Sequence, residues 1–303
     1  MPARSPSSRI GPHGSNLKAS DTRIHSWPGF PDDSISSVKP TGFIVAMVLL
    51  VDVGNSHVHC GLGDQRGVRR RVDFNTSSLI DPSHEAEAGE AFRRFVGRTP
   101  ISGAVLCSVV PRAVRTVQST LRNLFGWRAL QLSPRISGGV GIDYPEPETI
   151  GQDRLANALA ARHHFGAPVV VIDFGTAVTF DVVNQSGNYV GGIIAPGLAM
   201  MTDYLHEKTA LLPKIRIRAP RRAIGRSTEQ AMLAGAVYGY RGMVQELLRT
   251  VQQEMGHSEF PVVATGSYAA FMAKQVPQIT AVRPGLTLEG LRLLWKWEVT
   301  GTK

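Results

Sequence analysis

The sequence predicts an α/β protein made of two related domains, each a sheet with helices packed on it. Apolar runs of strand length alternate with stretches of helical periodicity from Met47 onward. The order strand, strand, strand, helix, strand, helix, strand occurs twice. In both copies the first strand ends in aspartate, a spacer, glycine and a polar residue, at 52–55 and at 173–176. The same step at the same place of a repeated pattern indicates two units that face each other.

Composition fits this fold and excludes several classes of protein. The chain has 303 residues, of which 43% are hydrophobic, enough for two domains with ordinary cores. Cys60 and Cys107 are too few and too far apart for a disulfide scaffold or a cysteine-based zinc site. They fit a reducing compartment, so we expect a cytoplasmic protein. No apolar run reaches the length of a membrane span.

Residues 1–46 differ from the rest of the chain. They are rich in Ser, Pro, Gly and Arg and lack periodicity, so we expect a disordered N-terminal extension. A simpler hypothesis is that Met47 is the natural start. Mass spectrometry of the natural N-terminus distinguishes the two, and an intact segment 1–46 would contradict the start-site hypothesis.

The first domain is predicted over residues 47–150. Its second helix begins at Pro111, and proline is well tolerated in the first turn of a helix. The predicted segments are strands 49–53, 58–62 and 69–74, helix 85–96, strand 101–110, helix 111–125 and strand 128–132.

The second domain is predicted over residues 151–285. It comprises strands 169–174, 178–183 and 188–195, helices 196–208 and 227–255, strand 261–265, helix 268–275 and strand 279–283. The long helix 227–255 carries several small residues, which suit close packing either inside its own domain or against a second copy of the chain. An amphipathic helix at 286–297 follows, and we expect it to pack back on the first domain.

Asp52 poses the main local question, because aspartate is depleted from buried strands unless something compensates its charge. One interpretation is a hairpin turn, since Asp, Gly, Asn and Ser are the usual turn residues. The other is that Asp52 holds a metal ion beside a phosphate lying against the backbone of Gly54 and Asn55. The local sequence favours neither, but the counterpart Asp173 makes Asp52 one side of a two-domain phosphate site.

The segment 144–157 lies between the two repeats, where a substrate would have to bind. Pro147 favours a helix start, which places Gly151, Asp153 and Arg154 in the first turns, where free N–H groups attract anions. The alternative is an ordinary helix cap with a solvated charge.

Two such aspartate turns resemble the acetate and sugar kinase, heat-shock ATPase and actin superfamily. That resemblance implies two ribonuclease-H-like domains of the actin-like ATPase superfamily, facing across a nucleotide cleft. Six motifs in order are more specific, and through them the chain resembles type III pantothenate kinases from Met47 to the last helix. The motifs are Asp52-Val-Gly-Asn55, Tyr144 with Gly151-Gln-Asp153-Arg154, Asp173-Phe-Gly-Thr176-Ala, Gly191-Gly192-x-x-x-Pro196-Gly197, Thr209-Ala-Leu-Leu-Pro213 and Leu286-Thr-Leu-Glu-Gly-Leu.

The resemblance implies an activity and its ligands. Such an enzyme phosphorylates the primary hydroxyl of pantothenate from ATP, the first step of coenzyme A biosynthesis. The implied ligands besides pantothenate are ATP, Mg²⁺ and a monovalent cation, K⁺ or NH₄⁺. The implied assembly is a homodimer formed through the second domain.

The same resemblance implies roles for individual residues. Asp153 would be the catalytic general base, Asp52 the ligand of Mg²⁺ beside the phosphates, and Asp173 the ligand of the monovalent cation. The expected ATP contacts are Asp52, Val53, Gly54, Asn55, Ser56, His57, Val58, His59 and Thr176. The expected pantothenate contacts are Tyr144, Gly151, Gln152, Asp153, Arg154 and Thr209.

Three positions depart from the family pattern. Ser56 and His57 stand where the family commonly has Thr and Asn, and Ser267 stands in place of the second glycine of a pair near the adenine side. His57 and His59 share one face of a strand, which would suit a metal pair, but no third ligand is evident.

Two other functions remain as alternatives. A regulatory protein of this fold, a transcriptional accessory factor, would use the basic runs 66–71 and 214–226 and the net charge of +9 to contact DNA. A pure binding module has no need of both Asp52 and Asp153, so we do not expect nucleic acid as a partner. Because no apolar run has the length of a membrane span, we do not expect a membrane partner either. The other alternative is a superfamily kinase or phosphohydrolase for another substrate, for which the segment 144–154 would be the wrong shape.

Overall fold

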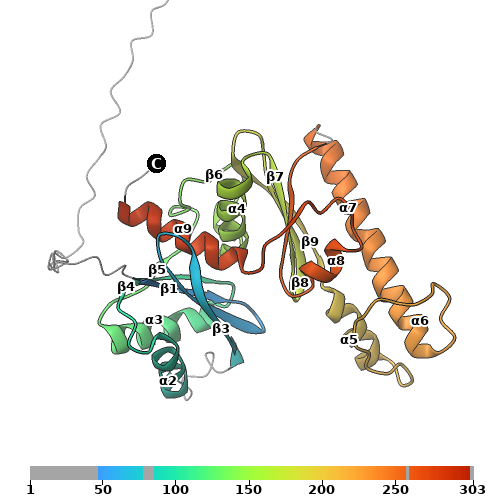
Figure 1. Ribbon diagram of the computed structural model, residues 1–303, viewed down its shortest axis with the longest axis horizontal. Coiled ribbons are helices and arrows are strands. Elements are labelled where there is room, and N and C mark those ends of the chain that lie inside the picture. The colour runs from blue at the N-terminus through green and yellow to red at the C-terminus, as the bar shows by residue number, and fades with distance from the viewer. Residues whose placement is uncertain (1–46, 78–84, 257–258, 301–303) are drawn as a thin grey trace, which may run out of the picture. The chain divides into compact units, whose positions relative to one another are not determined.

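The structure, a computed structural model, describes residues 47–77, 85–256 and 259–300 (Figure 1). The predicted extension 1–46 lies outside the described residues. Among the residues that are described, no helix combines the length and the apolar character needed to cross a membrane.

The first sheet contains five strands in the order β3-β2-β1-β4-β5. They are β1 (Met47–Val53), β2 (His57–Gly63), β3 (Val68–Asn75), β4 (Ile101–Ser108) and β5 (Leu130–Gln131). The first three are antiparallel neighbours, whereas β4 and β5 run parallel to β1. Helices α2 (Glu85–Val96) and α3 (Pro111–Phe125) cover one face, where Phe92, Val117 and Leu121 pack on Leu49 and Val51.

The second sheet repeats this order and adds one strand. It reads β11-β10-β7-β8-β9-β6, so β9-β8-β7-β10-β11 corresponds strand for strand to the first sheet. Its strands are β7 (Val169–Phe174), β8 (Ala177–Val183), β9 (Asn188–Pro196), β10 (Val262–Thr265), β11 (Ala281–Val282) and β6 (Gly141–Ile142). The repeat predicted from the sequence is therefore confirmed, whereas β6, which pairs with β9, was not predicted.

The remaining helices of the second unit are α5 (Leu198–Lys208), α6 (Thr228–Ala234), α7 (Tyr240–Met255) and α8 (Ala269–Ala273). The predicted helix 227–255 is continuous, but a π-helical turn at Gly235–Gly239 joins α6 to α7. Such turns often mark functional positions in helices. Here the Cα atoms of Gly235 and Gly239 face open space, so the turn presents bare backbone on its outer side.

Two helices join the units through one core. α4 (Gln152–Phe165) packs against α9 (Leu286–Thr300), α4 also contacts β7 and β8, and α9 contacts β1, β2 and β4 (Figure 1). A Cβ on Gly290 would lie 2.0 Å from the carbonyl oxygen of Ala156, so only glycine allows the two helices to cross this closely. The first and second sheets thus share one core with α4 and α9.

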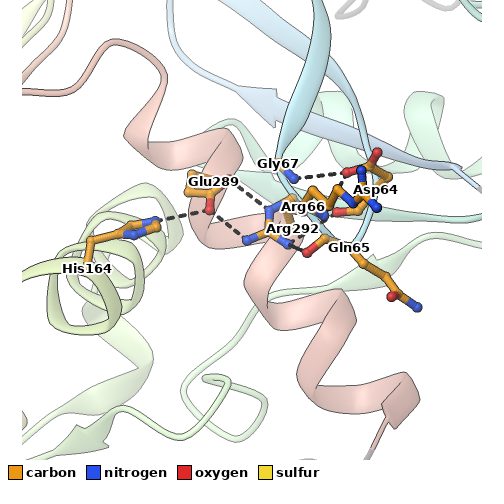
Figure 2. Close-up of polar contacts among 7 residues, drawn as sticks. All are labelled: Asp64, Gln65, Arg66, Gly67, His164, Glu289 and Arg292. Atoms are coloured by element: carbon orange, nitrogen blue, oxygen red, sulfur yellow. Dashed lines mark hydrogen bonds and ion pairs between the residues drawn. The ribbon is translucent and has the colours of Figure 1, made fainter.

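A buried arginine fixes α9 to the β2–β3 hairpin, as Figure 2 shows. Arg292, 5% exposed, donates from Nε and Nη2 to Glu289 at 2.8 and 2.7 Å, and from Nη1 to the carbonyl oxygens of Asp64 and Gln65 at 3.2 and 3.1 Å. His164 on α4 lies 3.0 Å from the same Glu289. Burial opposes ionisation of Glu289, but the bonds from Arg292 and His164 lower its pKa. Every donor group of this guanidinium therefore has a protein partner.

Two predicted boundaries are wrong. Pro147 does not start the long helix, because Pro147–Thr149 forms a short 3₁₀ turn and Ile150 is extended, burying its side chain in the shared core. The helix starts instead at Gln152, after Gly151. The strand predicted to reach residue 110 ends at Ser108, whose hydroxyl bonds the backbone of Val110 and turns the chain.

Candidate active site

Asp52 points toward α4. Alternate residues of a strand face the same way, so Asp52 lies on the same side of β1 as Val48 and Leu50. Both of these residues belong to the core shared with α4. The carboxylate is 8% exposed, and its one described hydrogen bond comes from the Cys107 thiol, Sγ to Oδ1 3.2 Å. Burial and the charge of Asp153 raise the pKa of Asp52 to about 7. In the described part of the chain, no lysine or arginine bonds this carboxylate, and the charge of His59 only partly offsets the rise in its pKa.

Asp173 occupies the matching position on β7 and also faces α4. Nδ2 of Asn157 donates to Asp173 Oδ2 at 3.1 Å, and Thr287 Oγ1 from α9 donates to Asn157 Oδ1 at 3.0 Å. Burial raises the pKa of Asp173 to about 6, although the Asn157 amide lowers it. Asn157 thereby fixes the carboxylate from the helix that both sheets share.

The first turn of α4 carries the predicted base. Gln152 Oε1 accepts the N–H of Ser108 at 2.9 Å, which ties the helix start to the end of β4. Asp153 is partly buried, and its Oδ1 accepts the N–H of Arg154 at 2.8 Å. Burial raises the pKa of Asp153, although the bond from Arg154 lowers it. Asp153 is close enough to raise the pKa values of both Asp52 and Asp173.

The two aspartate turns touch each other. Gly54 N–H donates to His57 at 2.9 Å and Gly175 N–H donates to Ala177 at 3.1 Å, so each turn is closed by a backbone bond. The hydroxyls of Ser56 and Thr176 lie 3.1 Å apart, and both turns are accessible to solvent. Two loops 120 residues apart therefore share one surface, as a polyphosphate site requires.

Arg154 is bound to the second sheet. Its Nε lies 2.5 Å from Oδ1 of Asp181 on β8, and its Nη2 donates to the carbonyl oxygen of Phe180 at 3.0 Å. Its guanidinium carbon lies 5.7 Å from the ring centre of Tyr189, and the Tyr144 ring lies 6.2 Å from that of Tyr189. Burial raises the pKa of Asp181 to about 7 even though Arg154 lowers it.

The side chains of some predicted site residues make no contact, in the described part of the chain, with the group formed by the carboxylates of Asp52, Asp153 and Asp173. Val53 and Val58 are fully buried on the opposite face of the sheet, so only their backbone atoms are available to a ligand. Thr209 is exposed at the end of α5, and its hydroxyl bonds Leu205 and Leu212 of its own segment. His59, by contrast, belongs to the group: it lies opposite Asp52 across β1 and β2, and its charge lowers the pKa of both Asp52 and Asp173. Its Nδ1 lies 2.8 Å from Oδ1 of Asp73.

His57 is exposed, and its ring lies 6.2 Å from that of His59. Among the described ranges, no three His, Cys, Asp or Glu side chains are grouped to hold a metal ion, so this pair lacks a third ligand.

Sequence reasoning missed three residues of the site: Asn157, Asp181 and Cys107. Asn157 lies four residues after Asp153, hence on the same side of α4, which is the only signal it gave. Asp181 interrupts a strand of apolar and small residues, as Asp52 does. Nothing in the sequence pointed to Cys107, because its contact to Asp52 depends on the pairing of β1 with β4.

The carboxylates suit cations. Mg²⁺ prefers oxygen ligands and usually binds through one or two carboxylates together with water and phosphate oxygens. Asp52 offers such an oxygen in a region where Asp153 and Asp173 add negative charge. Asp173, with its second oxygen held by Asn157, is equally an oxygen donor for a larger cation.

Two sheets of one strand order, each with an aspartate at the penultimate residue of its first strand beside a shared helix, define an α/β fold of two ribonuclease-H-like units, the architecture of the actin-like ATPase superfamily. The solved structure of a Baf family protein from Campylobacter jejuni agrees with this fold at a TM-score of 0.54 and 17% identity. The match covers 83% of this chain and 99% of that one.

Sequence comparison gives the family. The family model described as type III pantothenate kinase matches residues 48–250. The type III pantothenate kinase of Methylacidiphilum infernorum is 42% identical over 253 residues, which are 82% of this chain and 87% of that protein. That of Akkermansia muciniphila is 50% identical over 212 residues, 70% of this chain and 85% of that protein. The chain belongs to the type III pantothenate kinase family, and it is a phosphotransferase with an alcohol group as acceptor.

Proposed function

We propose that this protein transfers the γ-phosphoryl group of ATP to the primary hydroxyl of pantothenate, the first step of coenzyme A biosynthesis. One observation carries the proposal beyond family membership. The charge of Asp153, on the first turn of α4, raises the pKa of both Asp52 and Asp173, and the two aspartate turns meet where the hydroxyls of Ser56 and Thr176 lie 3.1 Å apart. A base and cation-binding carboxylates thus lie next to a surface suited to phosphates.

ATP binds with its phosphates on the two turns. The N–H groups and side chains around Gly54, Asn55 and Ser56 donate from the first turn, and Thr176 donates from the second. Asp52 would hold Mg²⁺, which would neutralise phosphate charge. The nucleoside end extends toward Ser267, beside a cavity of about 410 Å³ lined by Tyr268, Thr202, Lys214 and Arg216.

Asp153 removes the proton from the attacking hydroxyl. The pKa of this carboxyl is raised by burial, and a base works best when its pKa approaches the working pH. The N–H of Arg154 holds one carboxylate oxygen, which leaves the other to accept the proton. The helix start thereby orients the base without a further side chain.

Pantothenate lies against the start of α4. Gly151, Gln152 and Arg154 face it from the helix, and Tyr144 closes the site from the preceding segment. Thr209 stands apart from these residues, so its contact requires a second copy of the chain or a movement of its segment. Asp173 would hold the monovalent cation, K⁺ or NH₄⁺.

The protein acts as a homodimer in the cytoplasm. Large apolar side chains are exposed on and beside α5, namely Ile194, Met200, Tyr204, Leu205 and Leu211. The open face of the π-helical turn, with Gly235 and Gly239, permits close approach of a second chain. Gly239→Arg should convert a dimer to a monomer in light scattering, and a monomeric wild-type chain would refute this assembly. Cys60 and Cys107 are free thiols, as in a reducing compartment.

One assay tests the proposed reaction. Purified protein with ATP, Mg²⁺, K⁺ and pantothenate should consume ATP, and Asp153→Asn should lower kcat by a factor of about 10² to 10⁴ while the protein still folds. Glu246→Gln, which alters an exposed carboxylate on α7, is the control and should keep wild-type turnover. Absence of pantothenate-dependent turnover in both K⁺ and NH₄⁺ would refute the function. Full activity in Na⁺ alone would refute only the role of Asp173.

A further inference from the structure

Asp181 is fully buried and has no part in the function proposed above. Its Oδ1 accepts from Arg154 Nε at 2.5 Å, and its Oδ2 accepts from Thr179 Oγ1 at 3.3 Å. Burying a carboxylate is costly unless it is paired, and many buried pairs add no net stability. A purely structural role therefore does not explain why β8 carries this charge.

The guanidinium of Arg154 is held along one edge only. Nε bonds Asp181 and Nη2 bonds the carbonyl oxygen of Phe180, while the ring of Tyr189 lies under the group. An arginine has five N–H donors in a flat fork, and Nη1 and Nη2 together form its outer end. Nη1 makes no hydrogen bond to any residue in the described part of the chain. One N–H of Nη1 and the second N–H of Nη2 therefore remain as two parallel donors at the start of α4.

Arg292 is the matched structural case in the same molecule. It too is buried against a carboxylate, but its Nη1 is taken up by the carbonyl oxygens of Asp64 and Gln65 (Figure 2). An arginine that only ties elements together uses its outer end on the protein. Arg154 keeps that end available, beside Asp153.

We propose that Asp181 is a positioning residue that holds Arg154 by its inner edge, so that the Nη1–Nη2 end meets an oxyanion of the bound substrates. Arginine binds carboxylate and phosphate oxygens with two parallel bonds, and fixing one edge removes the rotation that would misalign the other. The oxyanion is the carboxylate of pantothenate or a phosphoryl oxygen of the transferred group. The inference rests on the proposed reaction and adds Asp181 to it as a residue that acts through Arg154.

The test compares Asp181→Asn with Glu289→Gln, each of which removes the charge from one buried arginine pair. Asp181→Asn should lower kcat/KM for pantothenate by about tenfold or more, whereas Glu289→Gln should lower thermal stability and leave kcat/KM within about twofold of wild type. In a double-mutant cycle with Arg154→Ala, the two losses should be far from additive, because Asp181 acts through Arg154. Additive losses, or equal effects of the two single variants, would overturn the proposal.

A neutral substrate analogue separates the two oxyanions. Pantothenol has a hydroxyl in place of the carboxylate. If Asp181→Asn raises KM for pantothenate and leaves turnover of pantothenol unchanged, Arg154 meets the carboxylate. If the variant lowers kcat for both substrates, Arg154 meets the phosphoryl group.

A second variant covers the case in which Asp181→Asn does not fold. Arg154→Lys keeps a positive charge opposite Asp181 but cannot offer two parallel donors. It should lose kcat/KM to a similar degree, and full activity of Arg154→Lys would overturn the proposal. A wild-type protein without pantothenate-dependent turnover refutes the proposed function itself, whereas an active wild type with an unaffected Asp181→Asn refutes only this inference.

Discussion

The two aspartate turns stand at the same place of the repeated unit, yet the protein holds their carboxylates differently. Asp52 receives a hydrogen bond from a thiol, a weak donor, whereas Asp173 receives an amide N–H from Asn157. Burial raises the pKa of both, to about 7 for Asp52 and about 6 for Asp173. The two repeats thus carry the aspartate at the same position, but only the second gives it a strong hydrogen-bond donor. Asp52 is left to an external cation, and Asp173 is partly satisfied by the fold.

The largest expected effect is on kcat, when Asp52 and Asp173 are replaced one at a time. Asp52→Asn should lower kcat by about 10² to 10³, because in the proposed reaction Asp52 is the group that places Mg²⁺ on the phosphates. Asp173→Asn should cost about tenfold and abolish the difference between K⁺ and Na⁺. Steady-state rates across Mg²⁺ and K⁺ concentrations measure both. Equal losses of kcat in the two variants, with the same dependence on Mg²⁺ and K⁺, would contradict the difference proposed between the two turns.

The second prediction concerns Gly266, whose backbone packs against the carboxylate of Asp173. Gly266 has φ +88°, and a Cβ there would lie 2.5 Å from Asp173 Oδ1. Gly266→Ala should therefore destabilise the protein by about 3 kcal/mol, of which left-handed backbone accounts for about 1–2 kcal/mol. Gly126→Ala is the control, since Gly126 has φ +81° with no atom near its Cβ position. Urea unfolding compares them, and equal losses would show that Asp173 is not crowded.

Stability should also depend on pH through Asp52. Its pKa is about 7 in the folded protein, against 3.8 for an unperturbed aspartate, so protonation of Asp52 favours the folded state at low pH. That advantage is lost as pH rises through 7. Without cations, wild type should therefore lose roughly 2–3 kcal/mol relative to Asp52→Asn between pH 5 and pH 8. Urea unfolding of both proteins at each pH gives this difference, and a difference of the opposite sign would mean that Asp52 is neutralised by the fold.

The smallest effect should come from the thiol on Asp52. Cys107→Val removes the donor and should shift the acidic limb of the kcat profile to higher pH, with at most about a fivefold loss of rate at pH 7. Cys107→Ser replaces the donor and should restore the profile. Identical profiles for Val and Ser would show that the thiol does not influence Asp52.

The repeat and its two aspartates could be predicted because both are properties of short segments. Strand periodicity located Asp52 and Asp173, and the order of elements gave the relation between the sheets. The start of α4 could not be read in the same way, because the burial of Ile150 in a distant core decides it. The pairing of Arg154 with Asp181 joins residues 27 positions apart, and it exists only because α4 lies across β8.

Helix α9 has a consequence for biosynthesis of the protein. Its side chains Leu288, Leu291 and Leu294 complete the core that contains Val48 and Leu50 of β1, and Arg292 bonds a hairpin 228 residues earlier. Until α9 has been translated, that face of the first sheet lacks the cover that α9 gives it, so part of its apolar surface is exposed. The part of the chain that is made first is therefore the part whose fold is completed last.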